Sequence, residues 1–117
     1  MPNQSTALDR VYQALSDPTR RAVIQRLSRG PATVSELAKP FRMSLPSVVQ
    51  HLQVLEESGL IKTQKVGRVR TCKIVPKALI SAEEWIAHQR ALWEGRLDRL
   101  EAYLDKLQAK GENDEQG

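Results

Sequence analysis

The stretch from Met43 to Ile74 (MSLPSVVQHLQVLEESGLIKTQKVGRVRTCKI) restricts the possible folds more than any other part of this chain. Ser44 can cap a helix in which apolar residues recur at helical spacing, and Gly59 can end that helix in a left-handed conformation. Two short segments then flank Gly67 and Arg68, and a glycine in the first loop position suits a type II′ turn. The pattern predicts a helix followed directly by a two-stranded hairpin.

Helix signals lie on both sides of this stretch. Two capping boxes begin at Thr33 and Ser81, while Gly30-Pro31 and Pro40 are stop signals. The expected helices start at Ser5 or Thr6, at Asp17-Pro18, at Thr33, at Ser44 and at Ser81. The last of them runs to about Ala109. The expected strands are Leu60–Val66 and Val69–Ile74. The predicted fold is therefore mainly α with a small β-hairpin, in the order α-α-α-α-β-β-α.

Charge and length limit the kind of partner. Of 117 residues, the last seven hold three of the 14 acids and none of the 18 bases, which leaves +7 for residues 1–110. A body of this charge favours a polyanionic partner. We expect one domain over residues 1–110 and a disordered acidic tail over 111–117. A single cysteine, Cys72, and the lack of a long apolar run predict a cytoplasmic protein that is not in a membrane.

The helix that begins at Ser44 has two different faces. Its apolar face must lie against the core, and it consists of Leu45, Val48, Val49, Leu52 and Leu55. The opposite face presents Ser47 and Gln50, short neutral side chains of the type that contact base edges in a major groove. Both could equally be ordinary solvent-facing residues. His51, on the flank, fits either a packed core-edge residue or a contact to phosphate or base.

The hairpin is basic and contains no acid. Its cations are Lys62, Lys65, Arg68, Arg70 and Lys73. Arg68 lies at the tip, where a side chain can follow the DNA backbone into a minor groove. Charge on an exposed strand edge also prevents pairing with other chains, and the two roles are compatible.

Several motifs in order now resemble those of the ArsR/SmtB family of bacterial winged-helix repressors, over roughly residues 5–104. They are Asp17-Pro18-Thr19-Arg20-Arg21, Val34-Ser35-Glu36-Leu37-Ala38, Ser47-Val48-Val49-Gln50-His51-Leu52, Leu55-Glu56-Glu57-Ser58-Gly59-Leu60-Ile61 and the Gly67-Arg68 wing. The resemblance implies a winged helix-turn-helix homodimer that represses from an inverted-repeat operator until an inducer releases it. By position it implies a recognition helix with Ser44, Ser47, Gln50 and His51, and a wing with Lys65, Arg68 and Arg70.

Metal-sensing members of that family carry ligands that this chain lacks. No cysteine occurs from Thr33 to Ala38, and the last helix has only His88, with Glu84 one turn before it. Two copies of His88 in a dimer could share a zinc ion, but a stable zinc site needs about four ligands. Cys72 has no second cysteine with which to pair, so packing is its expected role. We predict neither metal nor cofactor.

The last helix carries more apolar surface than one small domain needs. Leu79, Ile86, Trp93, Leu100 and Leu107 recur every seven residues, with Leu97 and Leu104 at d-like positions. A second copy of the chain is the simplest partner, although this surface could cover its own domain instead. The predicted dimer contacts are Leu8, Tyr12, Ile86, Trp93, Leu97, Leu100 and Leu104.

These features favour a homodimeric, sequence-specific repressor of double-stranded DNA, acting on its own promoter or elsewhere. Alternatives are a winged-helix module that docks on protein and has no operator, or a sensor gated by metal or redox state. No nucleophile–base pair, clustered carboxylates or phosphate-binding glycine loop is present, so an enzyme is not expected. The sequence identifies no inducer.

Overall fold

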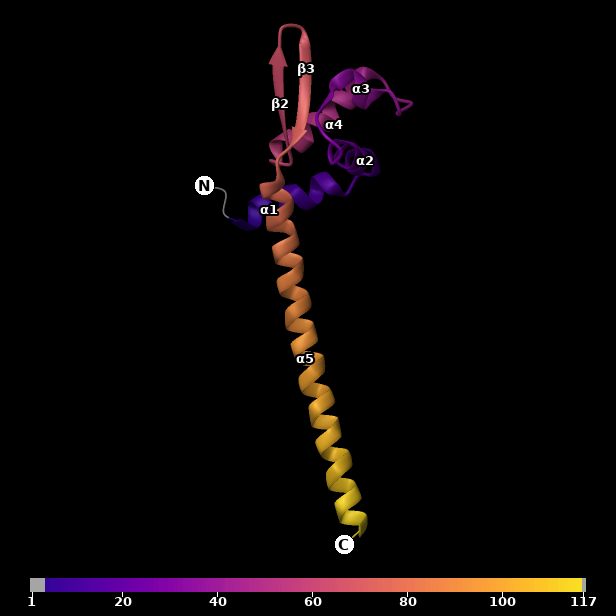
Figure 1. The fold of residues 1–117 in the computed structure, drawn as a ribbon, viewed down its shortest axis with the longest axis vertical. Helices are drawn as coiled ribbons and strands as arrows, with labels where there is room; N and C mark the ends of the chain where they lie inside the picture. Colours follow the sequence, from indigo (N-terminus) through magenta and orange to yellow (C-terminus); the bar gives the residue numbers. More distant parts are fainter. Residues whose placement is uncertain (1–3, 117) are drawn as a thin grey trace. The chain divides into compact units, whose positions relative to one another are not determined.

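The structure is a computed structural model that describes the backbone of residues 4–116 and the side chains of residues 6–111. It is mainly helical and has one small sheet (Figure 1). The helices are α1 (Gln4–Leu15), α2 (Pro18–Leu27), α3 (Val34–Ala38), α4 (Leu45–Glu57) and α5 (Pro76–Gln116), and the strands are β1 (Ala32–Thr33), β2 (Ile61–Val66) and β3 (Val69–Ile74). The chain divides into two units, Met1–Ala82 and Glu83–Gly117, which are described separately. Of the described helices, none is long and apolar enough to cross a membrane.

Side chains cap three helices of the first unit, as predicted. In α2, α3 and α4 the residue before the helix accepts a hydrogen bond from a backbone N–H of the first turn, which satisfies a donor that the helix itself leaves free. The pairs are Arg20 N with Asp17 Oδ2 at 3.0 Å, Glu36 N with Thr33 Oγ1 at 3.1 Å, and Ser47 N with Ser44 Oγ at 3.3 Å. Local chemistry therefore fixes where α2, α3 and α4 begin.

Two glycines set the ends of α4 and of the hairpin. Gly59 follows α4 with φ of 81°, and Gly67 opens the β2–β3 turn with φ of 63°. No described residue other than glycine has a positive φ. Arg68 therefore has a negative φ, which fits the predicted II′ turn and excludes a I′ turn.

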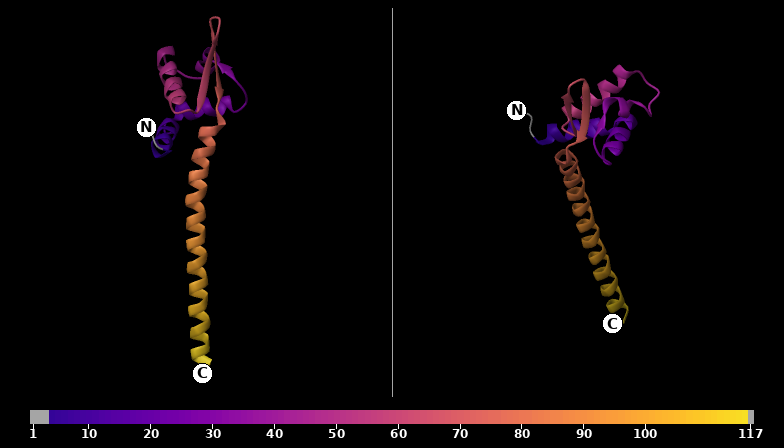
Figure 2. Two further views of the ribbon diagram at one scale, coloured as in Figure 1. Left: turned by 90° about the vertical axis from the view of Figure 1, so that its left-hand side faces the viewer. Right: turned by 45° about the horizontal axis from the view of Figure 1, so that its top comes forward.

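The sheet has three antiparallel strands in the order β1-β3-β2, and both views of Figure 2 show β2 and β3 as a narrow hairpin. Ala32 pairs with Cys72 and Thr33 with Thr71, so β1 adds a short third strand that the sequence analysis missed. Two residues are too few to give an alternating pattern. They are recognisable only from their pairing with β3.

The core of the first unit forms around α4, which contacts α1, α2, α3 and β2. The buried residues are Val11, Ala14, Val23, Ile24, Leu27, Ala32, Leu37, Val48, Leu52, Leu55, Leu60, Ile61, Cys72 and Ala82. Three of the five residues predicted for the apolar face of α4 are among them. Leu45 is 54% exposed, so its predicted core position is wrong. Leu45 is the first residue of α4, where the helix has just left the loop and the core has not yet closed over it.

Four further boundaries differ from the prediction. β2 starts at Ile61, one residue after the expected Leu60. α1 starts at Gln4, so neither Ser5 nor Thr6 lies before it as a cap. α5 starts at Pro76, five residues before Ser81, because proline at a first helical position costs no hydrogen bond and fixes a helical φ. α5 also continues to Gln116, past the expected end near Ala109 and through most of the tail that was expected to be disordered. In the segment before α4, Met43 is exposed and Phe41 packs against the core.

The second unit is a single helical segment, the part of α5 from Glu83 onward. Its large apolar side chains have no second element of that unit to cover them, and each is about half exposed or more. They are Trp85, Ile86, Leu92, Trp93, Leu97, Leu100, Tyr103, Leu104 and Leu107. On a 3.6-residue wheel they occupy one broad side of the helix.

Candidate nucleic-acid interface

The N-terminal end of α4 carries the polar residues predicted to read DNA. Ser44 uses its hydroxyl as the N-cap, and this oxygen also lies 2.9 Å from Ser47 Oγ. The side chain of Gln50, one turn further, is exposed and forms no hydrogen bond with any residue in the described part of the chain. The first two turns thus present two linked hydroxyls and one uncommitted amide, groups that donate and accept hydrogen bonds without carrying charge.

His51 is more enclosed than its neighbour Gln50. Its Nδ1 lies 3.2 Å from Nη1 of Arg20 and 3.8 Å from Oδ2 of Asp17, and its side chain is 23% exposed. The sequence left open whether His51 packs at the edge of the core or contacts DNA, and in the structure it packs at the edge of the core. A contact to DNA stays a prediction.

Asp17 is the charged group at this junction between α2 and α4. The hydrogen bond from the Arg20 N–H lowers the pKa of its carboxyl below the ordinary value, against partial desolvation. The Arg20 guanidinium acts in the same direction, as does the His51 ring when it is protonated. From the sequence, Asp17 is expected to start a helix and Arg20 belongs to the same motif, but neither is expected to contact His51. The signal was available in Asp17-Pro18-Thr19-Arg20, but its spacing alone does not reveal the contact with α4.

The hairpin brings like charges directly opposite each other. The register of β2 and β3 pairs Lys62 with Lys73 and Lys65 with Arg70. All four side chains are exposed, and alternation along the strands places the two pairs on opposite faces. Like charges in directly opposed positions destabilise a hairpin in isolation. This sheet region is therefore strongly positive on both faces.

Arg68 lies at the tip of the hairpin between the last paired residues, Val66 and Val69. All three are exposed, and no ion pair involving Arg68 occurs among the described residues. Gly67 sets the turn that carries it. The predicted wing residues Lys65, Arg68 and Arg70 thus share one end of the hairpin.

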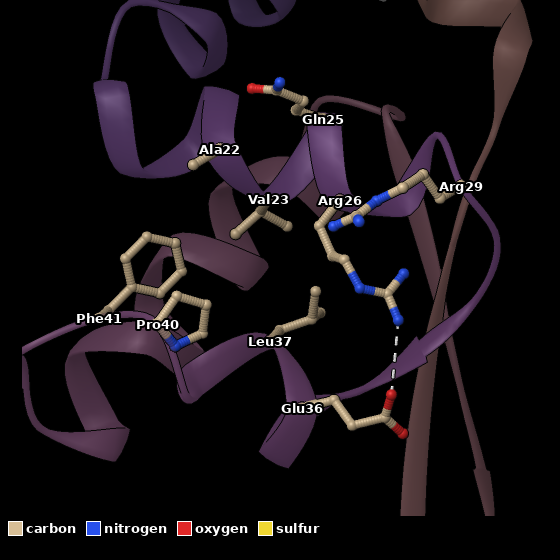
Figure 3. Close-up of a pocket in the computed structure, with 9 residues that line it drawn as sticks. All are labelled: Ala22, Val23, Gln25, Arg26, Arg29, Glu36, Leu37, Pro40 and Phe41. Atoms are coloured by element: carbon tan, nitrogen blue, oxygen red, sulfur yellow. Dashed lines mark hydrogen bonds and ion pairs between the residues drawn. The ribbon is translucent and has the colours of Figure 1, made fainter.

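A separate cavity of about 660 Å³ lies between α2 and α3 (Figure 3). Phe41 and Pro40 line one end, and Arg26 and Arg29 line the other, where Arg26 Nη2 lies 3.5 Å from Glu36 Oε2. None of the residues predicted to bind DNA lines it.

Side chains that could hold a metal are not gathered anywhere in the described part of the chain. Cys72 is fully buried on β3 next to β1, and burial raises the pKa of its thiol. A buried protonated thiol is a poor nucleophile and a poor metal ligand.

The predicted dimer contacts fall in both units. Leu8 and Tyr12 are partly buried against the core of the first unit, and Tyr12 Oη donates a hydrogen bond to the carbonyl of Ala82 at 2.9 Å. The predicted contacts of the second unit, Ile86, Trp93, Leu97, Leu100 and Leu104, are all exposed.

Comparison with known proteins adds independent information. A model described as a helix-turn-helix domain matches residues 15–64. The HTH-type transcriptional regulator Rv2034 of Mycobacterium tuberculosis is 44% identical over 71 residues, which cover 61% of this chain and 66% of that regulator. The transcriptional repressor SdpR of Bacillus subtilis is 34% identical over 61 residues, covering 52% of this chain and 68% of the repressor. The chain thus spans about two thirds of the length of these curated relatives.

A solved structure matches over more of the chain. The crystal structure of the ArsR family transcriptional regulator RHA00566 has a TM-score of 0.76 and 57% sequence identity, and the match covers 80% of this chain and 97% of that one. The helix-turn-helix match includes α4, and the element order of the chain is that of a winged helix-turn-helix. This chain belongs to the ArsR family of DNA-binding winged helix-turn-helix transcriptional regulators.

Proposed function

We propose that the protein is a homodimeric repressor that binds an inverted-repeat operator in double-stranded DNA. Each chain contributes one reading helix, α4, and one wing, the β2–β3 hairpin. Because it acts on DNA, we place it in the cytoplasm. Residues 1–110 of two chains form the DNA-binding and dimerisation body, with α4 helices about 34–36 Å apart, one turn of B-DNA.

The single observation that carries DNA binding is the pairing of like charges in the hairpin. Lys62 faces Lys73 and Lys65 faces Arg70, with no acid in either strand. The repulsion between these paired cations is unfavourable in the free protein. Binding to DNA relieves it, because the cations neutralise phosphates and the counterions condensed on the DNA are released. A hairpin that only needed protection from edge pairing would not require two opposed pairs.

Sequence discrimination is assigned to α4. Ser47 and Gln50 are neutral hydrogen-bonding residues near its N-terminus, and Gln50 is exposed and uncommitted. A glutamine amide can donate and accept at the same time, as recognition of an adenine edge requires. The phosphate contacts of the wing position the protein, and the base contacts of α4 select the site.

Dimerisation is assigned to α5. Its second-unit segment exposes one broad apolar side that includes Trp93 and Leu97. An apolar surface of this extent marks an interaction site. The heptad spacing of Ile86, Trp93 and Leu100 favours another helix as the partner, and a second copy of α5 supplies one.

The test is the salt dependence of DNA binding. The wild-type protein first selects a duplex from a random-sequence pool, and fluorescence anisotropy then measures its affinity at several salt concentrations. Arg68→Ala is expected to weaken binding to all duplexes and to reduce the slope of log K against log salt by about 1. Lys110→Ala removes the same charge from an exposed position near the end of α5 and is expected to leave the slope unchanged. If Arg68→Ala and Lys110→Ala have the same slope, the wing does not contact phosphate.

A further inference from the structure

We infer that Arg20 is a positioning residue for DNA binding: it joins the end of α1 to α4 and holds His51 as the neutral tautomer protonated at Nε2. This inference rests on the proposed function, because it concerns how α4 is held for reading DNA. The contact between Arg20 and His51 is described above, but it has no part in the proposed function as stated.

Arg20 connects three helices. Its backbone N–H is held by Asp17 at the start of α2. Its side chain donates from Nε to the carbonyl of Ala14 at 2.7 Å and from Nη2 to the carbonyl of Gln13 at 3.0 Å, both in the last turn of α1. Carbonyls in the last turn of a helix have no partner within the helix and form its negative end, so a guanidinium is well matched to them.

The remaining arm of Arg20 reaches α4, where Nη1 lies 3.2 Å from His51 Nδ1. A guanidinium can only donate hydrogen bonds and does not lose its proton in proteins. Nδ1 must therefore be the acceptor. An imidazole that accepts at Nδ1 is neutral and carries its hydrogen on Nε2.

Two consequences follow for α4. The ring of His51 is fixed on one side, so the helix is tied to α1 through Arg20 next to the exposed Gln50. The other ring nitrogen, Nε2, is left as a hydrogen-bond donor, the form suited to a phosphate oxygen or a base acceptor. Protonation at Nδ1 would break the contact with Arg20 and direct that N–H to Asp17, whose Oδ2 lies 3.8 Å away.

The first measurement does not involve DNA. Ring ¹⁵N chemical shifts distinguish the two neutral tautomers from the charged ring, and the chain has only two histidines, so His88→Gln assigns the signals. At about pH 7.5 His51 is expected to be protonated at Nε2 alone, because Arg20 donates to Nδ1. Arg20→Ala is expected to lose this single tautomer, and Arg20→Lys serves in its place if that variant does not fold by circular dichroism.

A matched control lies at the next position. Arg21 donates from Nη1 to the carbonyl of Leu15 at 2.8 Å, so it also bonds to the end of α1 but not to His51. Arg21→Ala should lose a comparable contact while leaving the His51 tautomer unchanged. A role of Arg20 in folding alone would make the two variants alike in both spectrum and DNA binding.

The second measurement is affinity for the selected duplex. Arg20→Ala is expected to bind it about ten-fold more weakly than Arg21→Ala, as for loss of a hydrogen bond to a charged group. A His51 ring that is charged or protonated at Nδ1 in the wild type overturns the inference, as does an Arg20 variant that keeps both the tautomer and the affinity. If the wild type selects no duplex, the proposed function fails instead, and the spectra still decide the tautomer.

Discussion

The two units differ in how far they bury their own large apolar side chains. In residues 1–82 the large side chains from α4 to the start of β2, such as Leu55, Leu60 and Ile61, are fully or almost fully buried within the unit. In residues 83–117 the side chains of Trp93 and Leu97 are 61% and 55% exposed. The first unit contains what it needs for a core, whereas the single helical segment of the second unit cannot bury its own apolar side. Under the proposed function the first unit reads DNA and the second joins two chains, so we expect mutations to separate these two properties.

The largest expected effect is on self-association through the apolar side of α5. Leu97→Glu combined with Leu100→Glu places two charges on the exposed apolar side and should weaken self-association by at least about a hundred-fold, since an uncompensated buried charge costs about 3–5 kcal/mol. Sedimentation velocity measures the result. Ala91→Glu combined with Ala102→Glu adds the same charge to the opposite side of the helix and should leave the dimer intact. Equal behaviour of the two double variants would show that this side of α5 does not join the chains.

The next prediction concerns the core of the first unit, measured in the Leu97→Glu/Leu100→Glu background so that dissociation does not enter. Leu55→Ala removes a fully buried side chain of α4 and should lower the free energy of unfolding by about 2–5 kcal/mol in urea. Leu45→Ala, on the same helix but 54% exposed, should cost about 1 kcal/mol or less. If the background variant is itself unfolded, the first unit does not stand on its own core.

A smaller effect is expected at the reading face. Gln50→Ala should reduce the preference for the selected duplex over a scrambled one by about 1–3 kcal/mol, because a base-edge contact is lost. Its affinity for the scrambled duplex should hardly change, since the wing is intact. Gln25→Ala, an exposed glutamine on α2, is the control. Competition anisotropy gives both quantities, and an unchanged preference would remove Gln50 from the reading face.

The smallest predicted effect is the pH dependence of the α2 cap. The pKa of Asp17 is lowered in the folded protein, so its ionised form adds stability above the ordinary aspartate value of 3.8, and this is lost as the pH falls through the lowered pKa. Asp17→Asn keeps a capping oxygen but cannot titrate. The stability difference between wild type and variant, about 1 kcal/mol or less, should shrink from pH 5 toward pH 2 in urea unfolding. A difference that is constant over this range would contradict the role of the charge.

Much of the first unit could be predicted because its boundaries are encoded locally. The caps at Asp17, Thr33 and Ser44 and the turn at Gly67 are short-range chemistry, and all are confirmed. The failures required knowledge of more distant parts of the chain. β1 exists only because Cys72 and Thr71 lie beside it. Leu45 fits the apolar wheel but lies outside the core.

The candidate site was predictable in its residue types but not in its contacts. The basic residues of the hairpin were evident, yet their opposed pairing depends on the register of β2 and β3. Arg20 stood in a recognisable motif, but its bond to His51 joins residues 31 positions apart. Spacing along a chain does not specify which side chains meet across two helices.

The most direct test of the account is the stoichiometry on DNA. Analytical ultracentrifugation of the wild-type protein, alone and with its selected duplex, measures the mass of each species. The account predicts a dimer in the free protein and two chains on each duplex, with the Leu97→Glu/Leu100→Glu variant monomeric and weakly bound. A free protein that is monomeric at micromolar concentration and binds as one chain per duplex would contradict the claim that α5 joins two DNA-binding chains.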